Sequence, residues 1–240
     1  MEELQLEGKR IMVVGAHPDD CDFLAAGTAA RASSLGCDVV YVIATKGDRG
    51  SNDPRMTAAT LTKIRQREQT EAARILGVLA IEWLGYRDGE LEADINLKGD
   101  ITRMIRKHKP DIVITFDPAY IYDAERGRVN HTDHRKVGEA TMDAVYPLAR
   151  DALSFPGHAE AGYGPHAVRE LCFVSHKKTN AYCDITGFFE RKIEALSKHE
   201  SQLRDMERVE GFVRQWSEQA GKQAGVQLAE GFIRLEFRPL

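Results

Sequence analysis

The sequence lacks features that mark several large classes of protein. It contains no uninterrupted apolar run of roughly 18 residues, the length that a membrane-spanning helix needs. It also lacks a basic excess, because 33 Lys and Arg residues face 37 Asp and Glu residues, giving a formal net charge of −4. Surfaces that bind nucleic acid usually show such an excess, so this balance argues against a nucleic-acid partner.

Common phosphate-binding and nucleophile motifs are missing as well. Neither GxGxxG nor GxxxxGKS/T occurs, so the chain has no standard loop for cradling a phosphate. No GxSxG is present, which removes the nucleophile elbow of the serine hydrolases.

Cysteine is scarce, and its spacing indicates neither a metal site nor a disulfide framework. The first ten residues contain three glutamates and do not have the layout of a signal peptide. We therefore expect reduced thiols in a cytoplasmic protein. The four cysteines are Cys21, Cys37, Cys172 and Cys183.

What the sequence does contain is a globular composition, with 42% hydrophobic and 29% charged residues over 240 positions. No stretch is rich enough in Pro, Gly or Ser to separate domains, so we expect a single domain over residues 1–240. Short apolar runs without alternation favour strands that are buried on both faces. The predicted strands are 11–15, 38–45, 80–84, 111–115, 170–175 and 232–237.

Helical patterns separate most of these strands. Proline and aspartate open the first helix, and glycine or proline ends several of them. The predicted helices are 18–35, 57–76, 95–108, 131–148 and 188–219, with loops at 46–55, 85–89, 116–130 and 154–165. Alternation of strand and helix predicts a doubly wound α/β fold with right-handed crossovers.

Two motifs that mix histidine and aspartate fall at one predicted edge of the sheet. His17 and Asp20 follow the first strand, and His131 and His134 follow the loop after the fourth strand. Residues three apart share a face of a helical turn, so each pair can point at one ion. Two histidines and a carboxylate with an open position make a catalytic zinc arrangement.

A purely structural interpretation of these residues is also available. Asp19 or Asp20 suits the N-cap of the first helix, and Thr132 or Asp133 suits the N-cap of the later one. The presence of a second motif at the same edge favours the metal interpretation. Cys21, beside this motif, has no oxyanion partner in the sequence and is expected to be a small buried hydrophobe.

Several spaced elements together resemble the zinc-dependent N-acetylglucosaminyl deacetylases, the family named after LmbE and PIG-L. The resemblance covers residues from about 11 to 203 and leaves out the last 35 or so residues. The matching segments, in the same order as in the family, are 16–20 (AHPDD), 45–48 (TKGD), 65–68 (RxxE), 76–78 (LGV), 88–91 (DGEL), 131–134 (HTDH) and 199–202 (HESQ).

The resemblance implies a Rossmann-like, mostly parallel sheet with helices on both faces. It also implies a single zinc and hydrolysis of an N-acetyl group on an amino sugar. Asp19 would be the general base, and His131, oriented by Asp133, would face the oxyanion. Arg65 and Asp88 would meet sugar hydroxyls, although Arg65 in a helix could equally pair with Glu68 or Glu71. The implied zinc ligands are His17, Asp20 and His134.

One departure from the family pattern is Cys21, which stands where the family most often has glutamate. The implied chemistry agrees with the residues, because zinc polarises a carbonyl and activates water, and a free carboxylate can accept the proton. In the mechanism expected here, a protonated His131 stabilises the oxyanion, and the carboxylate of Asp133 holds its ring and keeps it charged.

Two rival functions stay open. A metal-dependent phosphoesterase would need two metals about 3.5–4 Å apart, and a non-catalytic protein could bind a sugar or nucleotide in the same pocket. The expected partner is a small amino-sugar substrate, and the sequence leaves open whether the chain forms a homo-oligomer. Tyr120, Tyr122 and Tyr163, in the loops at 117–130 and 154–166, are candidates for stacking on a sugar ring.

Overall fold

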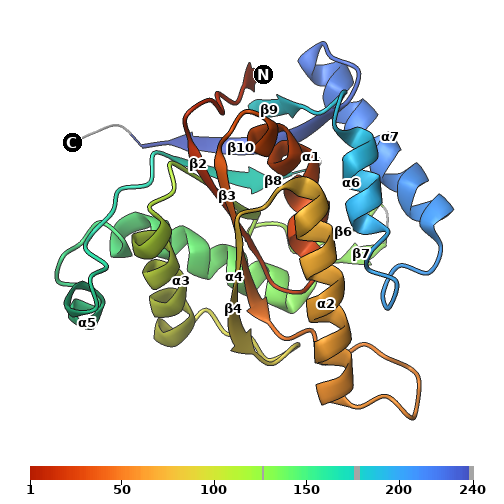
Figure 1. Ribbon diagram of the computed structural model, residues 1–240. Helices are drawn as coiled ribbons and strands as arrows, with labels where there is room; N and C mark the ends of the chain where they lie inside the picture. The colour runs from red at the N-terminus through yellow and green to blue at the C-terminus, as the bar shows by residue number, and fades with distance from the viewer. Residues whose placement is uncertain (126, 176–178, 238–240) are drawn as a thin grey trace.

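A computed structural model describes residues 1–125, 127–175 and 179–237 of the chain. Its centre is an eight-stranded sheet in the order β1-β9-β10-β8-β5-β2-β3-β4 (Figure 1). The strands of this sheet are β1 (Glu2–Glu3), β2 (Arg10–Gly15), β3 (Asp38–Thr45), β4 (Ala80–Tyr86), β5 (Ile112–Phe116), β8 (Glu170–Val174), β9 (Ala181–Asp184) and β10 (Ala229–Glu236).

The middle of the sheet is parallel and buried on both faces. β2 pairs with β3 and with β5, β3 pairs with β4, and β5 pairs with β8, all in parallel. Five of the six residues of β2 and seven of the eight residues of β3 are buried. Their unalternating apolar sequences fit this position, because both faces of such strands are covered by helices. β10 is antiparallel to β8 and to β9.

Helices cover both faces of the sheet (Figure 1). One apolar core holds residues of α1, α2, α6 and α7 together with the strands, and a second core holds residues of α3 and α4. The prediction of a mostly parallel, doubly wound α/β fold is therefore confirmed. The helices are α1 (Asp20–Ser34), α2 (Ala58–Leu76), α3 (Ile95–His108), α4 (Thr132–Asp143), α5 (Pro156–Glu160), α6 (Phe189–Leu196) and α7 (Met206–Ala224).

Two predicted helices were too long. The helix expected over 131–148 gives way after Asp143 to a wider π-type turn, Ala144–Leu148, that contains Pro147. Proline has no N–H with which to continue the helical hydrogen bonds. The helix expected over 188–219 is broken between Leu196 and Met206 into α6 and α7.

Short elements were missed altogether. β1 has two residues and β9 has four, and the predicted loop at 154–165 holds the five-residue helix α5. A small hairpin, β6 (Tyr122–Asp123) with β7 (Arg128–Val129), lies inside the loop expected over 116–130. Segments this short carry too few residues for a periodic pattern to show.

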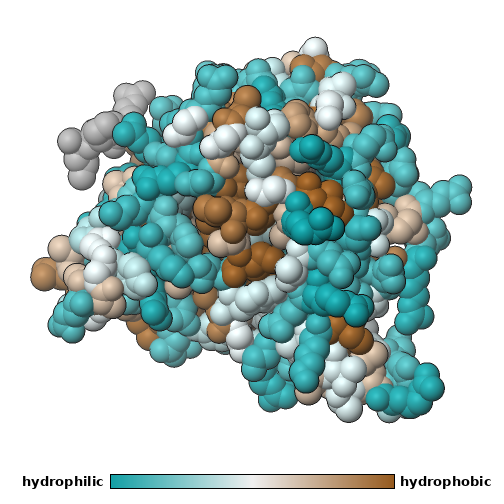
Figure 2. All heavy atoms as spheres, viewed as in Figure 1, coloured by the Kyte–Doolittle hydropathy of each residue, from teal (hydrophilic) through white to brown (hydrophobic). Residues whose placement is uncertain are grey.

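The outer surface is mostly hydrophilic in the view of Figure 2, with apolar side chains gathered near the middle of that face. Among the described residues, no helix has the length and apolar character needed to cross a membrane.

Candidate active site

A cavity of about 790 Å³ lies at the carboxyl ends of the central strands. Its walls come from the turn after β2, the loops after β3, β4 and β5, the first turn of α4, and parts of α1, α2 and α7. Ligands of open parallel sheets bind at this edge. Seven of the eight predicted site residues line the cavity: His17, Asp19, Asp20, Arg65, Asp88, His131 and His134.

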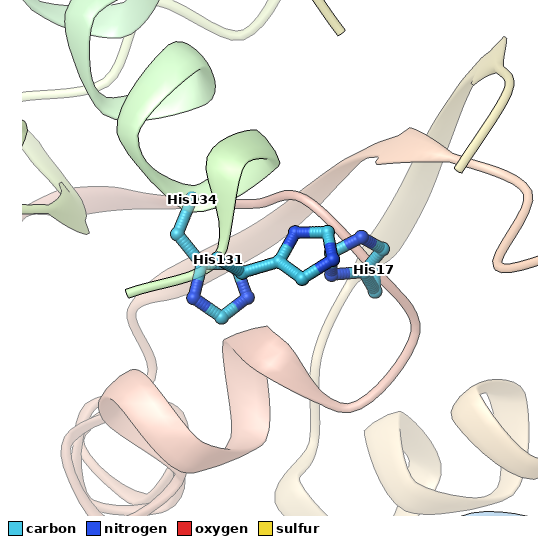
Figure 3. A group of neighbouring side chains, drawn as sticks. All are labelled: His17, His131 and His134. Carbon is cyan, nitrogen blue, oxygen red and sulfur yellow. The ribbon is translucent and has the colours of Figure 1, made fainter. Parts of the chain in front are cut away.

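The two histidine motifs meet in this cavity (Figure 3). The rings of His17 and His134 have centroids 5.4 Å apart, and His131 lies 4.7 Å from His17 and 5.3 Å from His134. The carboxylate of Asp20 lies between the rings of His17 and His134. One of its carboxylate oxygens is 3.3 Å from His17 Nδ1, and the other is 3.2 Å from His134 Nε2.

The remaining nitrogen of each ring has its own partner. His17 Nε2 lies 3.2 Å from Asp133 Oδ2 and 3.3 Å from Asp88 Oδ1. His134 Nδ1 lies 3.1 Å from Asn130 Oδ1. When these oxygens accept N–H bonds, the lone pairs that remain are on His17 Nδ1 and His134 Nε2, the two atoms that face Asp20. Metal-binding histidines are usually held by such outer acceptors.

Asp20 is fixed and ionised in this arrangement. Its Oδ2 accepts hydrogen bonds from the backbone amides of Ala16 (2.9 Å) and His17 (2.7 Å). Burial alone would raise the pKa of Asp20, but His134 and His17, when protonated on the nitrogens that face it, bring it well below its ordinary value. A metal ion bound by the lone pairs of those nitrogens would take the place of these protons. The donor set of two imidazole nitrogens and one carboxylate oxygen therefore fits a zinc ion.

His17 also belongs to two groups of three side chains that could bind a metal ion. Nitrogens of His17, His131 and His134 lie within 4.8 Å of one another, as do atoms of His17, Asp88 and Asp133. Burial would lower the pKa of His17, but hydrogen bonds with Asp133, Asp20 and Asp88 raise it to about 12. The site thus concentrates negative charge around His17, which favours a bound cation.

Asp19 stands beside these groups with an unusual backbone. Its φ is 104°, a left-handed value that residues with a side chain rarely adopt. Such a conformation persists only where the surroundings enforce it. Burial, and then the charge of Asp20, raise the pKa of Asp19 to about 7. A carboxylate with such a pKa suits proton transfer near neutral pH.

A buried polar network lies behind Asp19. Gln69 Oε1 accepts the backbone N–H of Asp19 at 2.8 Å, and Gln69 Nε2 donates to Asp22 Oδ2 at 2.8 Å. His199 Nε2 meets the same Asp22 oxygen at 2.8 Å. Asp22, Gln69 and His199 are each 0% exposed. Gln202 adds a hydrogen bond to the carbonyl of Pro18 at 2.8 Å.

Sequence analysis gave Asp22 and Gln69 no role and quoted 199–202 only as a matching segment. A signal existed for Gln69, because it shares the buried face of α2 with Ala72, Ala73 and Leu76. A polar side chain at a core position of a helix usually has a specific partner. Nothing in the spacing could show that the partner is the turn after β2.

Asp133 and His131 differ from the expectation. The carboxylate of Asp133 is buried and accepts from His17 Nε2 and from the backbone N–H of Gly89 (2.7 Å), not from the ring of His131. The ring of His131 instead accepts the backbone N–H of Asp133 at Nδ1, 3.2 Å away, as the N-cap of α4. Burial, and then the charges of His17 and His134, lower the pKa of His131. Because Nδ1 accepts that N–H, a neutral His131 ring carries its proton on Nε2.

Arg65 and Asp88 are both buried at the wall of the cavity. Arg65 Nη1 donates to the carbonyl of Gly47 at 2.8 Å and lies 3.7 Å from Asp88 Oδ2. Glu68, which sequence analysis offered as a partner of Arg65, instead accepts from the backbone and side chain of Ser201. Arg65 is thus held toward the cavity.

Other expectations have mixed outcomes. Tyr120 lines the cavity, whereas Tyr122 and Tyr163 are absent from its described lining. The four cysteines are free and buried. Cys21 Sγ donates to the carbonyl of Val13, and burial raises its pKa well above the ordinary value, so its position is that of a small core residue.

Comparison with known proteins places the chain in a family. The family model PIG-L, described as GlcNAc-PI de-N-acetylase, matches residues 12–145. A diacetylchitobiose deacetylase from Thermococcus kodakarensis is 32% identical over 232 residues, which cover 93% of this chain and 82% of the relative. A probable N-acetyl-α-D-glucosaminyl L-malate deacetylase 2 from Bacillus anthracis is 30% identical, over 81% of this chain and 82% of that protein.

A solved structure agrees. The N,N'-diacetylchitobiose deacetylase of Pyrococcus horikoshii, complexed with an inhibitor, superimposes with a TM-score of 0.87 at 32% identity, covering 95% of this chain and 84% of that one. The site therefore stands on an α/β fold shared with deacetylases of N-acetylated amino sugars. The chain belongs to the PIG-L family.

Proposed function

We propose that this protein is a zinc-dependent hydrolase that removes the acetyl group from the nitrogen of an N-acetylglucosamine-type sugar or its conjugate. The observation that carries the proposal is the meeting of His17 Nδ1 and His134 Nε2 around the carboxylate of Asp20. Asp19, a second carboxylate with a pKa near neutrality, stands next to them. The named activities of the relatives support the same reaction.

His17, Asp20 and His134 would hold the zinc. When bound, zinc supplies a Lewis acid that polarises the amide carbonyl and activates water. Asp133, Asp88 and Asn130 fix the two histidine rings so that their free nitrogens keep facing the ligand position.

Asp19 would move the protons. It accepts a proton from the attacking water as the water oxygen bonds to the amide carbon. It then gives that proton to the sugar nitrogen as the C–N bond breaks, leaving a free amine and acetic acid, which ionises to acetate. Its raised pKa suits both steps, because the group must take up and release one proton at the same pH.

His131 would stabilise the oxyanion as a neutral donor. With Nδ1 occupied by the backbone N–H of Asp133, the ring's proton sits on Nε2, the other nitrogen of a ring that lines the cavity. A fixed donor aimed at the developing negative charge is worth on the order of 10²–10³ in rate in comparable sites.

Arg65 and Asp88 would bind the sugar. Both lie on the side of the cavity formed by the loops after β3 and β4, and together they offer a donor and an acceptor for hydroxyl groups. Their buried side chains are held by Gly47 and His17, so little side-chain entropy is lost on binding.

The rival phosphoesterase function would need a second metal. Asp88 and Asp133 are the carboxylates that could supply it, but both are engaged with His17 Nε2 at hydrogen-bond distance. Their placement favours an outer role around one metal. A binding protein without turnover would have no use for Asp19 in its strained conformation beside the ligand set.

The test is acetate and amine release from N-acetylglucosamine and N,N'-diacetylchitobiose. The protein is assayed as purified, after chelation, and after zinc is added back. We expect activity that disappears with the metal and returns with about one zinc per chain. Full activity in the chelated protein would refute the metal role, and no release from any N-acetylated sugar with zinc bound would refute the deacetylase proposal.

A further inference from the structure

The active-site cavity has two sides of different character. On the side of β3 and β4 its wall carries Arg49, Arg65 and Asp88, which are charged. The proposed catalytic groups lie in the middle, after β2 and β5. On the side of β8 and β10 the described lining includes six apolar residues: Phe23, Leu24, Val174, Phe212, Trp216 and Ile233. We call these six residues the apolar arm.

The apolar arm is built by elements that the sheet order brings together. Val174 ends β8, and Ile233 belongs to the neighbouring β10. Phe212 and Trp216 are one turn apart on α7, with ring centroids 6.1 Å apart. α7 lies outside the matched family segment, residues 12–145, so the family model does not cover the part of the wall that α7 supplies.

The aromatic pair is positioned by its neighbours and lines the cavity. The guanidinium of Arg128, in the β6–β7 hairpin, lies 5.1 Å from the ring centre of Phe212, and Lys192 Nζ lies 6.0 Å from that of Trp216. Phe212 is nevertheless 39% exposed. Large apolar side chains left exposed in a cavity wall gain free energy when an apolar ligand group covers them.

We propose that the apolar arm is a subsite for an alkyl or aryl group attached to the amino sugar. This rests on the proposed deacetylase function. The occupant must belong to the substrate molecule itself, because the arm is continuous with the cavity that holds His17, Asp19 and Asp20. With the sugar ring against Arg65 and Asp88, its attached group extends past the catalytic residues toward α7.

The character of the wall favours an apolar group over a second sugar. A second sugar would bring several hydroxyls against the apolar arm, in which the indole N–H of Trp216 is the one hydrogen-bonding side-chain group. Each hydroxyl left without a partner there would lose its bonds to water. An alkyl chain has no such loss, and each methylene that becomes buried strengthens binding by roughly two- to fourfold.

The experiment compares methyl, butyl and hexyl glycosides of N-acetylglucosamine, in both anomeric forms, with N,N'-diacetylchitobiose. We expect kcat/KM for amine release to rise by roughly two- to fourfold per methylene for one anomer. This rise should be lost in Trp216→Ala and kept in Trp216→Phe. Glu218→Gln, an exposed change on the same helix, is the matched control and should keep the rise.

A second measurement separates this inference from the proposed function. Calorimetry with the corresponding glucosaminides, which carry a free amine and cannot be deacetylated, reports binding without turnover. Binding that becomes tighter as the alkyl chain lengthens would support the subsite. If no acetylated sugar were hydrolysed at the same time, only the deacetylase function would be refuted. The subsite would be refuted if neither amine release nor product binding depended on chain length. It would also be refuted if the enzyme preferred diacetylchitobiose and Trp216→Ala abolished that preference.

Discussion

The side chain of Gln69 on α2 bridges two aspartates of the turn and helix that follow β2. It accepts the backbone N–H of Asp19 at 2.8 Å and donates to the carboxylate of Asp22 at 2.8 Å. Because Asp19 has a φ of 104°, this bond holds a conformation that would otherwise relax. The side chain of Gln69 contacts the backbone of Asp19, not its proposed reacting carboxylate, so the role of Gln69 is to position Asp19.

Replacing Gln69 with Leu should therefore lower kcat by on the order of tenfold or more while leaving KM and bound zinc nearly unchanged. The variant keeps the apolar packing of α2 but leaves the Asp19 N–H without its partner. Lys63→Leu, an exposed position on the same helix, is the control. Equal losses of zinc and kcat would show instead that Gln69 merely supports the fold of the site.

His131→Ala should lower kcat by about 10²–10³ with little effect on KM, because a donor to the oxyanion acts mainly in the transition state. His131→Gln retains an N–H donor and should recover part of the loss. Steady-state kinetics on zinc-loaded protein measures both variants. A decrease of less than about threefold in His131→Ala would remove His131 from oxyanion stabilisation.

Arg65→Ala should raise KM for an N-acetylated sugar more than it lowers kcat, since its proposed contacts are with sugar hydroxyls and not with the reacting amide. Arg67→Ala is a matched control two residues away, with a side chain that is 72% exposed. Unchanged kinetics in Arg65→Ala would mean that this arginine only supports the loop at Gly47.

The buried pair of His199 and Asp22 predicts a pH dependence of stability. Burial lowers the pKa of His199, but the hydrogen bond to Asp22 and the charges of Asp22, Asp19 and Glu68 raise it above 6.5 overall. A raised pKa means that the folded state holds the proton more tightly. The contribution is therefore complete below about pH 6.5 and fades as the pH rises through the folded-state pKa.

Denaturant unfolding of chelated wild type and His199→Gln measures this contribution. We expect the advantage of the wild type to be larger at pH 6 than at pH 8.5. An advantage that stays constant over this range, or grows with pH, would show that His199 is neutral in the folded protein.

The main architecture was predictable because buried parallel strands carry a strong local signal. Residues 11–15 and 39–44 are continuous apolar runs, and the helices that follow these strands begin or end at Pro, Asp or Gly. Local patterns could not reveal β1 and β9, since two and four residues make no pattern. The break after Leu196 was also invisible, because the contacts that hold 199–202 come from Glu68 and Pro18, far away in sequence.

The meeting of the two histidine motifs was equally predictable, because motifs at the carboxyl ends of β2 and β5 come together when the two strands are adjacent and parallel. The hydrogen-bond partner of Asp133 could not be predicted. Which imidazole a carboxylate reaches depends on how the first turn of α4 sits over the strand ends, and the loop before it sets that placement. Spacing alone cannot distinguish His131, two residues away, from His17 across the cavity.

Asp19 is the residue on which the account depends most. Asp19→Asn keeps the shape of the side chain and suits a left-handed backbone, because Asn tolerates that region, but it cannot accept a proton. Asp20→Asn provides the comparison, since it should lose zinc as well as activity. Zinc content by metal analysis distinguishes the two aspartates before any rate is measured.

The most direct measurement is the single-turnover rate of acetate release by zinc-loaded Asp19→Asn against zinc-loaded wild type. The account predicts one zinc per chain in both proteins and a rate about 10²–10⁴-fold lower in the variant. A variant that binds zinc fully and retains more than about a tenth of the wild-type rate would contradict it, because that loss is smaller than general base catalysis contributes.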